Sequence, residues 1–255
     1  MVDTFRKHDP GAPDRYYRWE AAGLRWLGQG APPGTVAEVV HVGSHLDLVR
    51  LVPCAPDRES ALALGRALAT MHDAGADGFG AGPPGWEGEG YLGPLSEPLP
   101  LPLGPGRRWG AFYADLRVGH ALELLAARTR VPPALVTAVQ AVLEDLRAGR
   151  WDDDDTPARL HGDLWAGNVM WTEEGAVLID PAAHGGHRLT DLAMLELFGL
   201  PHLDHVIAGY QDVHPLPDGW RDLVGLHQLH PVAVHAVLFG GGYLARLEEL
   251  AHRYR

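Results

Sequence analysis

The stretch LHGDLWAGNVMWTEEGAVLIDP, residues 160–181, constrains the fold more than any other part of the sequence. After Asn168 it contains two short apolar runs separated by a turn with a glycine. Such a pattern predicts a β-hairpin over about 169–180. A hairpin brings the chain back to where it started, so Asp163, Asn168 and Asp180 are expected to converge at one end of it.

Two carboxylates and a carboxamide oxygen form a hard, oxygen-rich set that suits Mg²⁺, an ion that keeps waters and takes substrate phosphates as further ligands. The spacing H-x-D-x-x-x-x-N, followed by an aspartate that closes a hairpin, is the pattern of a kinase catalytic loop. Read singly, His161 and Asp163 could simply hydrogen-bond a turn. The joint match of these two residues with Asn168 and Asp180 favours phosphoryl transfer, with His161 as a buried orienting residue.

Composition narrows the remaining classes of function. The chain has 255 residues, 46% of them apolar, and a net charge of −12. An acidic protein repels phosphate backbones, which argues against a nucleic-acid partner. There is one cysteine, and we find neither a signal peptide nor a long uncharged apolar run. We therefore expect a cytoplasmic protein with no membrane partner.

The order of predicted elements indicates two unequal parts. Two predicted strands follow a helix, and a proline-rich break comes before the next helix. These elements are a helix over 14–30, strands over 36–43 and 46–53, the break over 53–57, and a helix over 59–75. We predict a small N-lobe over 1–52, which carries the nucleotide-side strands and a helix, and a larger C-lobe over 53–255.

The C-lobe is predicted to be mostly helical. Residues 75–106 are rich in Gly and Pro but contain three aromatic residues, which predicts an ordered loop laid over the surface. The acidic run 152–155 is interpreted as a solvated loop, not as a metal site. Helices are expected over 108–128, 132–148, 190–199, 203–213 and 220–253.

Lys7 is the only lysine that we find among the 21 basic residues. Where arginine has replaced lysine almost everywhere, a remaining lysine suggests a role that needs a compact ammonium instead of a planar guanidinium. The alternative is an exposed N-terminal lysine that persists by chance.

The block LHGDLWAGNVMW…VLIDPAAHGGHRLTDLAMLELFG resembles the fructosamine kinase (ketosamine 3-kinase) family, whose signature runs HGDLW-x-GN, IDP and GHR-x-x-DLAM. Trp165 separates this family from the aminoglycoside and choline phosphotransferases. The resemblance extends to WEGEGYLGPL, RWGAFYADLRVGHALELLA and LHQLHPVAVHAVLFGGGY, and so covers most of the chain. It implies an α+β, protein-kinase-like bilobal fold and an ATP-dependent kinase of ketosamines, with ATP and Mg²⁺ as cofactors.

The resemblance also implies roles for individual residues. Asp163 is expected to be the catalytic base, and Asn168 and Asp180 are expected to hold Mg²⁺ on the phosphates. Lys7 resembles the lysine that contacts the α- and β-phosphates, and Glu20 resembles its partner on a helix. Two further residues, Asp191 and His161, are expected to be structural supports. The acceptor pocket is expected to include Trp165, His187 and Arg188, unless these three pack against the catalytic loop instead.

A kinase-like N-lobe usually opens with a glycine-rich hairpin over the ATP phosphates. Only six residues precede Lys7 and none is glycine, so we expect a reduced N-lobe without that hairpin, through truncation or in a subgroup that binds nucleotide without it. The missing hairpin keeps open a pseudokinase-like binding protein. A second alternative, against which Trp165 argues, is an aminoglycoside-type or other amino-sugar phosphotransferase. A zinc site at His227, His230 and His235 is weakly supported, because Pro231 intervenes and no Cys or acidic ligand lies nearby.

Overall fold

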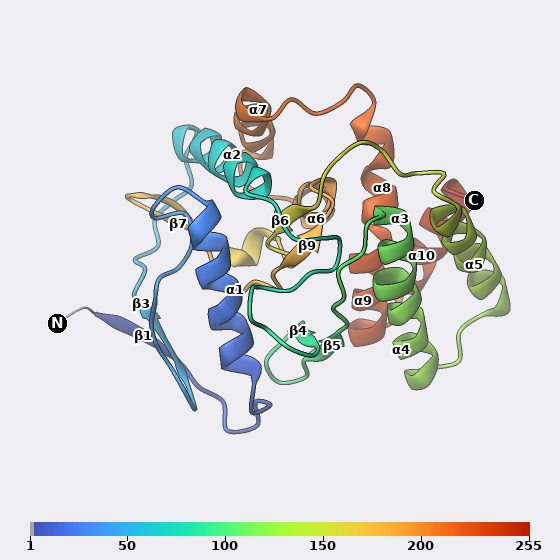
Figure 1. Cartoon of the computed structure of the whole chain (residues 1–255), viewed down its shortest axis with the longest axis horizontal. Helices are drawn as coiled ribbons and strands as arrows, with labels where there is room; N and C mark the ends of the chain where they lie inside the picture. The colour runs from blue at the N-terminus through green and yellow to red at the C-terminus, as the bar shows by residue number, and fades with distance from the viewer. Residues whose placement is uncertain (1–2) are drawn as a thin grey trace.

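The computed structural model describes residues 3–255 (Figure 1). A three-stranded antiparallel sheet lies at the N-terminal end, far from the C-terminus, in the order β1-β3-β2. Its strands are β1 (Thr4–Lys7), β2 (Val39–Val42) and β3 (Leu46–Val49). Lys7 is the last residue of β1 and lies opposite Leu46 of β3. Both strands predicted beyond residue 30 are present, although each is shorter than expected.

Helix α1 (Tyr16–Gly30) corresponds to the helix predicted over 14–30. Its buried apolar residues are spread over a wide arc of the helix, because Trp19, Leu27 and Leu24 each pack into a different hydrophobic cluster. Glu20 is also buried, with an exposed fraction of 2%. A carboxylate at such a position must be paired with a cation or hydrogen-bonded, or its burial would be very costly.

Helices α2 (Arg58–Asp73) and α7 (Leu203–Val213) pack closely together on one side of the molecule (Figure 1). Two glycines allow this approach. A Cβ atom at Gly65 would lie 1.9 Å from the carbonyl oxygen of Val206, and one at Gly209 would lie 2.0 Å from that of Leu62. The helix backbones therefore touch directly, which leaves no room for a side chain at either position.

The Gly- and Pro-rich segment 75–106 is ordered, as predicted, but it is not confined to the surface. It contains a short hairpin, β4 (Gly90–Leu92) with β5 (Leu99–Leu101). Three of its leucines and Phe79 are buried in the same core as the C-terminal helices: Leu92, Leu99 and Leu101. The indole Nε1 of Trp19 donates to the carbonyl of Tyr91 at 2.9 Å, which ties the segment to α1.

The helix predicted over 108–128 is interrupted. It consists of α3 (Trp109–Tyr113), a π-helical turn (Ala114–Gly119) and α4 (His120–Arg128). The wide turn carries the buried Arg117, whose Nη1 donates at 2.8 Å to the carbonyls of Leu116 and Pro102. Its hydrogen bond to a carbonyl of its own turn accompanies the departure from regular helix geometry.

The single helix predicted over 220–253 is wrong. A 3₁₀ turn (Trp220–Leu223) is followed by α8 (Val224–His227), α9 (Leu229–Phe239) and α10 (Gly242–Arg253). Gly240 and Gly241 have φ angles of 61° and 56°. This left-handed backbone favours glycine and ends α9.

The predicted hairpin is present as β7 (Val169–Thr172) and β8 (Gly175–Leu178). A second antiparallel pair, β6 (Ala158–Leu160) with β9 (His184–Gly186), was not predicted, because three-residue strands give too short a pattern to recognise. The remaining helices are α5 (Pro133–Ala148) and α6 (Leu189–Phe198), close to their predicted ranges. Across residues 3–255, no helix combines the length and apolar character needed to cross a membrane.

Candidate active site

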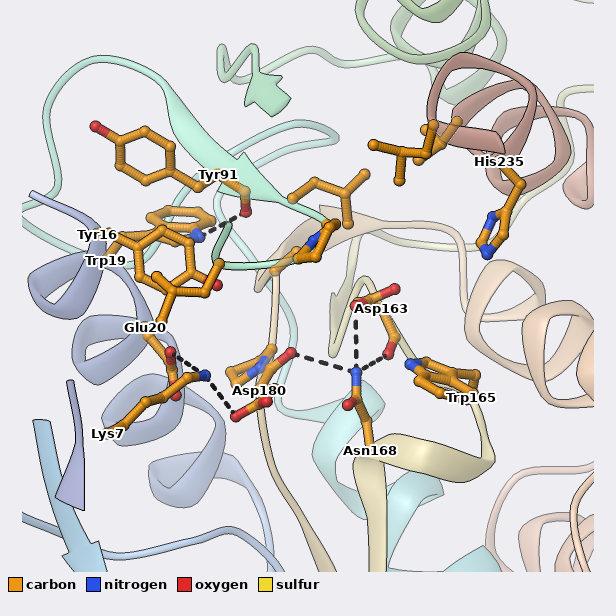
Figure 2. Close-up of a pocket in the computed structure, with 18 of the residues that line it drawn as sticks. Lys7, Tyr16, Trp19, Glu20, Tyr91, Asp163, Trp165, Asn168, Asp180 and His235 are labelled. Atoms are coloured by element: carbon orange, nitrogen blue, oxygen red, sulfur yellow. Dashed lines mark hydrogen bonds and ion pairs between the residues drawn. The ribbon is translucent and has the colours of Figure 1, made fainter. Parts of the chain in front are cut away.

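A cavity of about 290 Å³ lies between the end of β1, α1, the β4–β5 segment, the residues that flank the hairpin β7–β8, and α9. Its walls come from segments far apart in the sequence (Figure 2). Figure 2 shows polar groups gathered at one end, with the rings of Tyr16 and Trp19 above them, and Trp165 and His235 on the other side. The polar set consists of Lys7, Glu20, Asp163, Asn168 and Asp180.

Lys7 joins two carboxylates from different parts of the chain. Its Nζ lies 2.8 Å from Oε2 of Glu20 on α1 and 2.9 Å from Oδ1 of Asp180 after the hairpin. Burial lowers the pKa of Lys7, but the negative charges of Glu20 and Asp180 outweigh burial and leave the pKa above its ordinary value. The ammonium is therefore a fixed positive charge at the polar end of the cavity.

Asn168 holds the two ends of the hairpin together. Its Nδ2 donates to the carbonyl of Asp163 at 2.8 Å and to Oδ2 of the same residue at 3.2 Å. The amide N–H of Ile179 donates to the carbonyl of Asn168 at 3.1 Å. Asp180 follows with φ of 54°, an uncommon conformation for a residue with a side chain, which turns the chain out of the hairpin. The convergence predicted for Asp163, Asn168 and Asp180 is confirmed.

Asp163 lies between these groups and the apolar end of the cavity (Figure 2). Burial raises the pKa of Asp163 to about 7; the charges of Asp180 and Asp191 add to the rise, and the hydrogen bond from Asn168 opposes it. A carboxylate with a pKa near neutrality accepts a proton more readily than an ordinary aspartate and is suited to act as a general base.

His161 and Asp191 support the loop from behind. Oδ2 of Asp191 accepts the amide N–H of His161 at 2.7 Å, and Oδ1 accepts that of Gly162 at 3.0 Å. Burial lowers the pKa of His161, so the ring is neutral. Its Nε2 donates to the carbonyl of Ile179 at 2.9 Å, and its Nδ1 accepts the amide of Asp163 at 3.3 Å. These contacts match the structural roles predicted for both residues.

Two side chains in the cavity could hold a divalent ion. The carboxamide oxygen of Asn168 makes no hydrogen bond within residues 3–255, and one carboxylate oxygen of Asp180 is left over from the Lys7 pair. Both are hard oxygen donors, so the residues fit Mg²⁺. No cluster of three or more His, Cys, Asp or Glu side chains suited to a metal occurs in the described chain. An ion here would therefore need waters or substrate oxygens to complete its shell.

The other end of the cavity is aromatic. Trp165, His235 and Phe239 line it, and Trp165 and Phe239 are exposed by 42% and 63%. The ring of His235 lies 4.7 Å from that of Phe198 and 5.5 Å from that of Phe239. Trp165 thus lines the same cavity as Asp163, and its place near an acceptor stays a prediction.

His187 and Arg188 do not face this cavity. Arg188 is buried behind the catalytic loop, where it donates to Asp155 at 2.7 and 3.0 Å and to Asp73 at 2.8 Å. Nε2 of His187 lies 3.1 Å from Oδ2 of Asp153. Of the two interpretations of these residues, packing behind the loop is the one that their contacts support. The acidic run that was predicted to be solvated supplies their partners.

Sequence reasoning missed several residues that line the cavity. They are Tyr16, Tyr91, His235 and Phe239. Tyr16 could have been found, because it precedes Glu20 by one helical turn and therefore shares its face. His235 was considered only as a zinc ligand with His227 and His230, yet of these three only His235 lines the cavity. Nothing local to Tyr91 or Phe239 indicated that distant segments would meet there.

A second hollow of about 260 Å³ adjoins the polar end and shares Lys7 and Asp180 with it. Its other walls are mainly apolar side chains of the sheet and the hairpin. They include Phe5, Ala37, Leu48, Leu51, Met170 and Ile179. An apolar slot next to a fixed ammonium can hold a flat heterocycle that carries phosphates.

Known proteins resemble the chain over nearly its whole length. The family model described as fructosamine kinase matches residues 2–254. A probable ketoamine kinase of Klebsiella aerogenes is 32% identical over 225 residues, which cover 84% of this chain and 72% of the relative.

Solved structures agree with these matches. A putative fructosamine-3-kinase from Thermobifida fusca has 44% sequence identity and a TM-score of 0.90, with 99% of this chain and 85% of that one covered. A choline/ethanolamine kinase family protein from Mesorhizobium loti has 16% identity and a TM-score of 0.63, over 99% and 85% of the two chains. The second likeness shows the fold alone, which is protein-kinase-like, as predicted.

Proposed function

This chain belongs to the fructosamine kinase family and is a phosphotransferase that acts on a sugar-derived hydroxyl; from this premise we propose that it transfers the γ-phosphoryl group of ATP to a sugar hydroxyl of a ketosamine. A ketosamine is the adduct of a sugar with an amine. The observation that carries the proposal is the ammonium of Lys7 bonded to both Glu20 and Asp180, across the cavity from the Asp163–Asn168 pair.

Asp163 is the base in this proposal. Its carboxylate takes the proton from the attacking sugar hydroxyl as the oxygen of that hydroxyl bonds to the γ-phosphorus and the bond to the leaving ADP breaks. The hydrogen bond from Nδ2 of Asn168 fixes the direction of the carboxylate. Nδ1 of His161 accepts the amide N–H of Asp163 and so holds the backbone that carries it. A positioned base contributes roughly 10²–10⁴-fold to such a transfer.

The polar end of the cavity receives the phosphates. Lys7 neutralises negative charge there without rearrangement, because Glu20 and Asp180 already hold its ammonium in place. Asn168 and Asp180 would hold Mg²⁺ through their free oxygens, and the ion would supply further neutralisation of the phosphate charge. The apolar slot beside Lys7 receives the adenine ring.

The aromatic end receives the acceptor. The exposed ring of Trp165 offers a face on which a sugar can stack, next to the carboxylate that takes its proton. Burial lowers the pKa of His235, so its ring stays neutral and adds no charge that would repel the amine of a ketosamine. In this arrangement phosphate and acceptor approach Asp163 from opposite ends.

The substitution Asp163→Asn tests the proposal. The purified protein is expected to release ADP in the presence of Mg·ATP and ribulosamine or fructosamine. The variant is expected to lose about 10²–10⁴-fold in kcat, because an amide cannot accept the proton. The side chain keeps an oxygen for Asn168, so the melting temperature and the affinity for Mg·ATP should stay near those of the wild type. Full activity in the variant would show that the base is wrong.

Nucleotide titration separates this proposal from a non-catalytic binding protein. Calorimetry with and without Mg²⁺ should show magnesium-dependent binding of ATP. No binding at millimolar ATP would favour a pseudokinase-like role. A panel of ketosamines and aminoglycosides, assayed at equal concentrations, then distinguishes a ketosamine kinase from an aminoglycoside-type phosphotransferase.

A further inference from the structure

Tyr16 is the first residue of α1 and precedes Glu20 by one turn, so both side chains point to the same side of the helix. It lines the cavity, and its exposed fraction is 9%. Figure 2 shows its hydroxyl directed into the cavity, over the pair formed by Lys7 and Asp180 and toward Asp163. The residue has no role in the function proposed above.

The ring of Tyr16 is held firmly, but its hydroxyl is not. The ring packs against those of Tyr17 and Tyr91 at centroid distances of 5.9 and 5.6 Å, and Nζ of Lys7 lies 5.8 Å from its centroid. Within residues 3–255 the hydroxyl makes no hydrogen bond. A positioned donor without a partner, aimed into a cavity, is expected to meet a ligand.

The other buried tyrosines show that this is unusual in the molecule. Each of them uses its hydroxyl within the protein. Tyr17 accepts the amide of Asp9 at 2.6 Å, Tyr113 donates to the carbonyl of His227 at 2.7 Å, Tyr210 pairs with His72 at 2.8 Å, and Tyr254 donates to the carbonyl of Asp222 at 2.6 Å. Among these buried tyrosines, Tyr16 is the one whose hydroxyl makes no hydrogen bond within residues 3–255, and it alone lines the cavity.

The surroundings of Tyr16 determine what it can bind. Burial raises the pKa of Tyr16, and the nearby carboxylates of Glu20, Asp180 and Asp163 add to the rise, while Lys7 opposes it. The phenol therefore stays protonated and can donate a hydrogen bond at any working pH. Its hydroxyl faces the space between Lys7 and Asp163, where the transferred group must pass.

We propose that the Tyr16 hydroxyl donates a hydrogen bond to a non-bridging oxygen of the γ-phosphoryl group during transfer. The inference rests on the proposed function and adds a phosphate-binding residue to it. A donor already directed at oxygens that carry charge in the transition state lowers the barrier without reorganisation. Removal of one such donor is expected to lower kcat about 10²- to 10³-fold.

The test uses a matched pair of variants, Tyr16→Phe and Tyr17→Phe. Each removes one hydroxyl from adjacent buried rings, but only the first hydroxyl faces the cavity. Calorimetry gives the dissociation constants of Mg·ADP and of the non-hydrolysable analogue Mg·AMP-PNP for each protein. Steady-state assays give kcat and the KM for a ketosamine.

If Tyr16 binds the γ-phosphoryl group, Tyr16→Phe should weaken AMP-PNP about 5- to 10-fold, leave ADP within 2-fold, and lower kcat at nearly constant KM for the ketosamine. Tyr17→Phe should change none of these quantities. An unchanged ratio of AMP-PNP to ADP affinity in Tyr16→Phe overturns the inference. A raised KM for the ketosamine with that ratio unchanged also overturns it, because the hydroxyl would then bind the acceptor. An equal loss of AMP-PNP affinity and kcat in both variants overturns it as well.

The wild type distinguishes the two levels of the argument. If it binds and transfers but Tyr16→Phe behaves like it, only the role of Tyr16 fails. If the wild type binds neither nucleotide, the proposed function fails and the role of Tyr16 with it.

Discussion

Two polar clusters are built on the same stretch of chain, residues 161–191, and they differ in how completely their hydrogen bonds are satisfied. In front of the loop, Asn168, Asp180 and Tyr16 keep free oxygens or a free hydroxyl that face the cavity. Behind the loop, a continuous network runs from Asp191 through His72 and Tyr210 to Arg188 and its carboxylate partners.

The difference separates ligand binding from support. In the rear network Nε2 of His72 donates to Asp191 at 3.2 Å, and its Nδ1 accepts the hydroxyl of Tyr210 at 2.8 Å. Every strong donor there has a partner, so the network holds the loop rigidly but has nothing to offer a substrate. The front cluster is incomplete in the described chain, and its unmet capacity is what a nucleotide and a metal would satisfy.

The largest effect is expected from Lys7. Lys7→Met should lower kcat/KM about 10²- to 10³-fold, because a fixed charge on the phosphates is lost. Lys7→Arg should recover little of that activity, since a planar guanidinium cannot occupy the position of an ammonium between Glu20 and Asp180. Steady-state kinetics measures both.

Arg6→Met is the matched control for Lys7. Arg6 lies next to Lys7 on β1. Successive side chains of a strand point to opposite faces, so Arg6 pairs with Asp47 away from the cavity. Its kcat/KM should stay within 2-fold of the wild type. A fully active Lys7→Arg variant would mean that charge alone is needed at this position, whatever its geometry.

Arg188 should affect stability more than binding. Arg188→Ala leaves Asp155 and Asp73 without their shared partner in a mostly buried position, so the free energy of unfolding should fall by about 3 kcal/mol. The KM for the ketosamine should not change. Urea denaturation and initial rates measure the two quantities.

The exposed pair Arg66–Asp212 is the control for Arg188. Both partners are half exposed, and Arg66→Ala should cost less than about 1 kcal/mol. If Arg188→Ala instead raised the KM for the ketosamine strongly at unchanged stability, Arg188 would belong to the acceptor pocket. The distinction between the two clusters would then be wrong.

The buried histidines behind the cavity predict a pH dependence of stability. Burial lowers the pKa values of His184, to about 3, and of His227 and His230. Their folded pKa values lie below the unfolded value of about 6.5, so the stability they contribute is present above that pH and is lost as the pH falls below it. Each contributes a slope of up to about 1.4 kcal/mol per pH unit.

His230→Leu isolates one of these contributions. The side chain of His230 makes no hydrogen bond in the described residues, so leucine keeps its volume without removing a partner. Urea midpoints measured between pH 5 and pH 6.5 should give a slope lower by about 1 kcal/mol per pH unit than that of the wild type. An identical slope would mean that His230 is protonated in the folded protein.

The smallest effect is expected at the aromatic end. Trp165→Ala should raise the KM for the ketosamine about 5-fold and leave the KM for ATP unchanged, because a half-exposed ring gives up only part of its contact energy. Trp165→Phe should retain most of the affinity. A larger rise in the KM for ATP than for the ketosamine would show that the assignment of the two ends is reversed.

The sequence predicted local structure well where residues close together determine it. The hairpin over 169–180, the helix that carries Glu20 and the convergence of Asp163, Asn168 and Asp180 all follow from patterns within about twenty residues. The long helix over 220–253 failed because periodicity continued across Gly240 and Gly241, whose left-handed backbone interrupts it.

The sequence by itself determined which residue types are present for the chemistry, because their spacing around one turn is a local property of the chain. Only the tertiary structure decided which of them face the cavity. Lys7 meets Asp180 across 173 positions, Tyr91 reaches α1 through Trp19, and Arg188 turns away toward Asp155. Burial and direction depend on how distant segments pack together, and no periodicity within one segment contains that information.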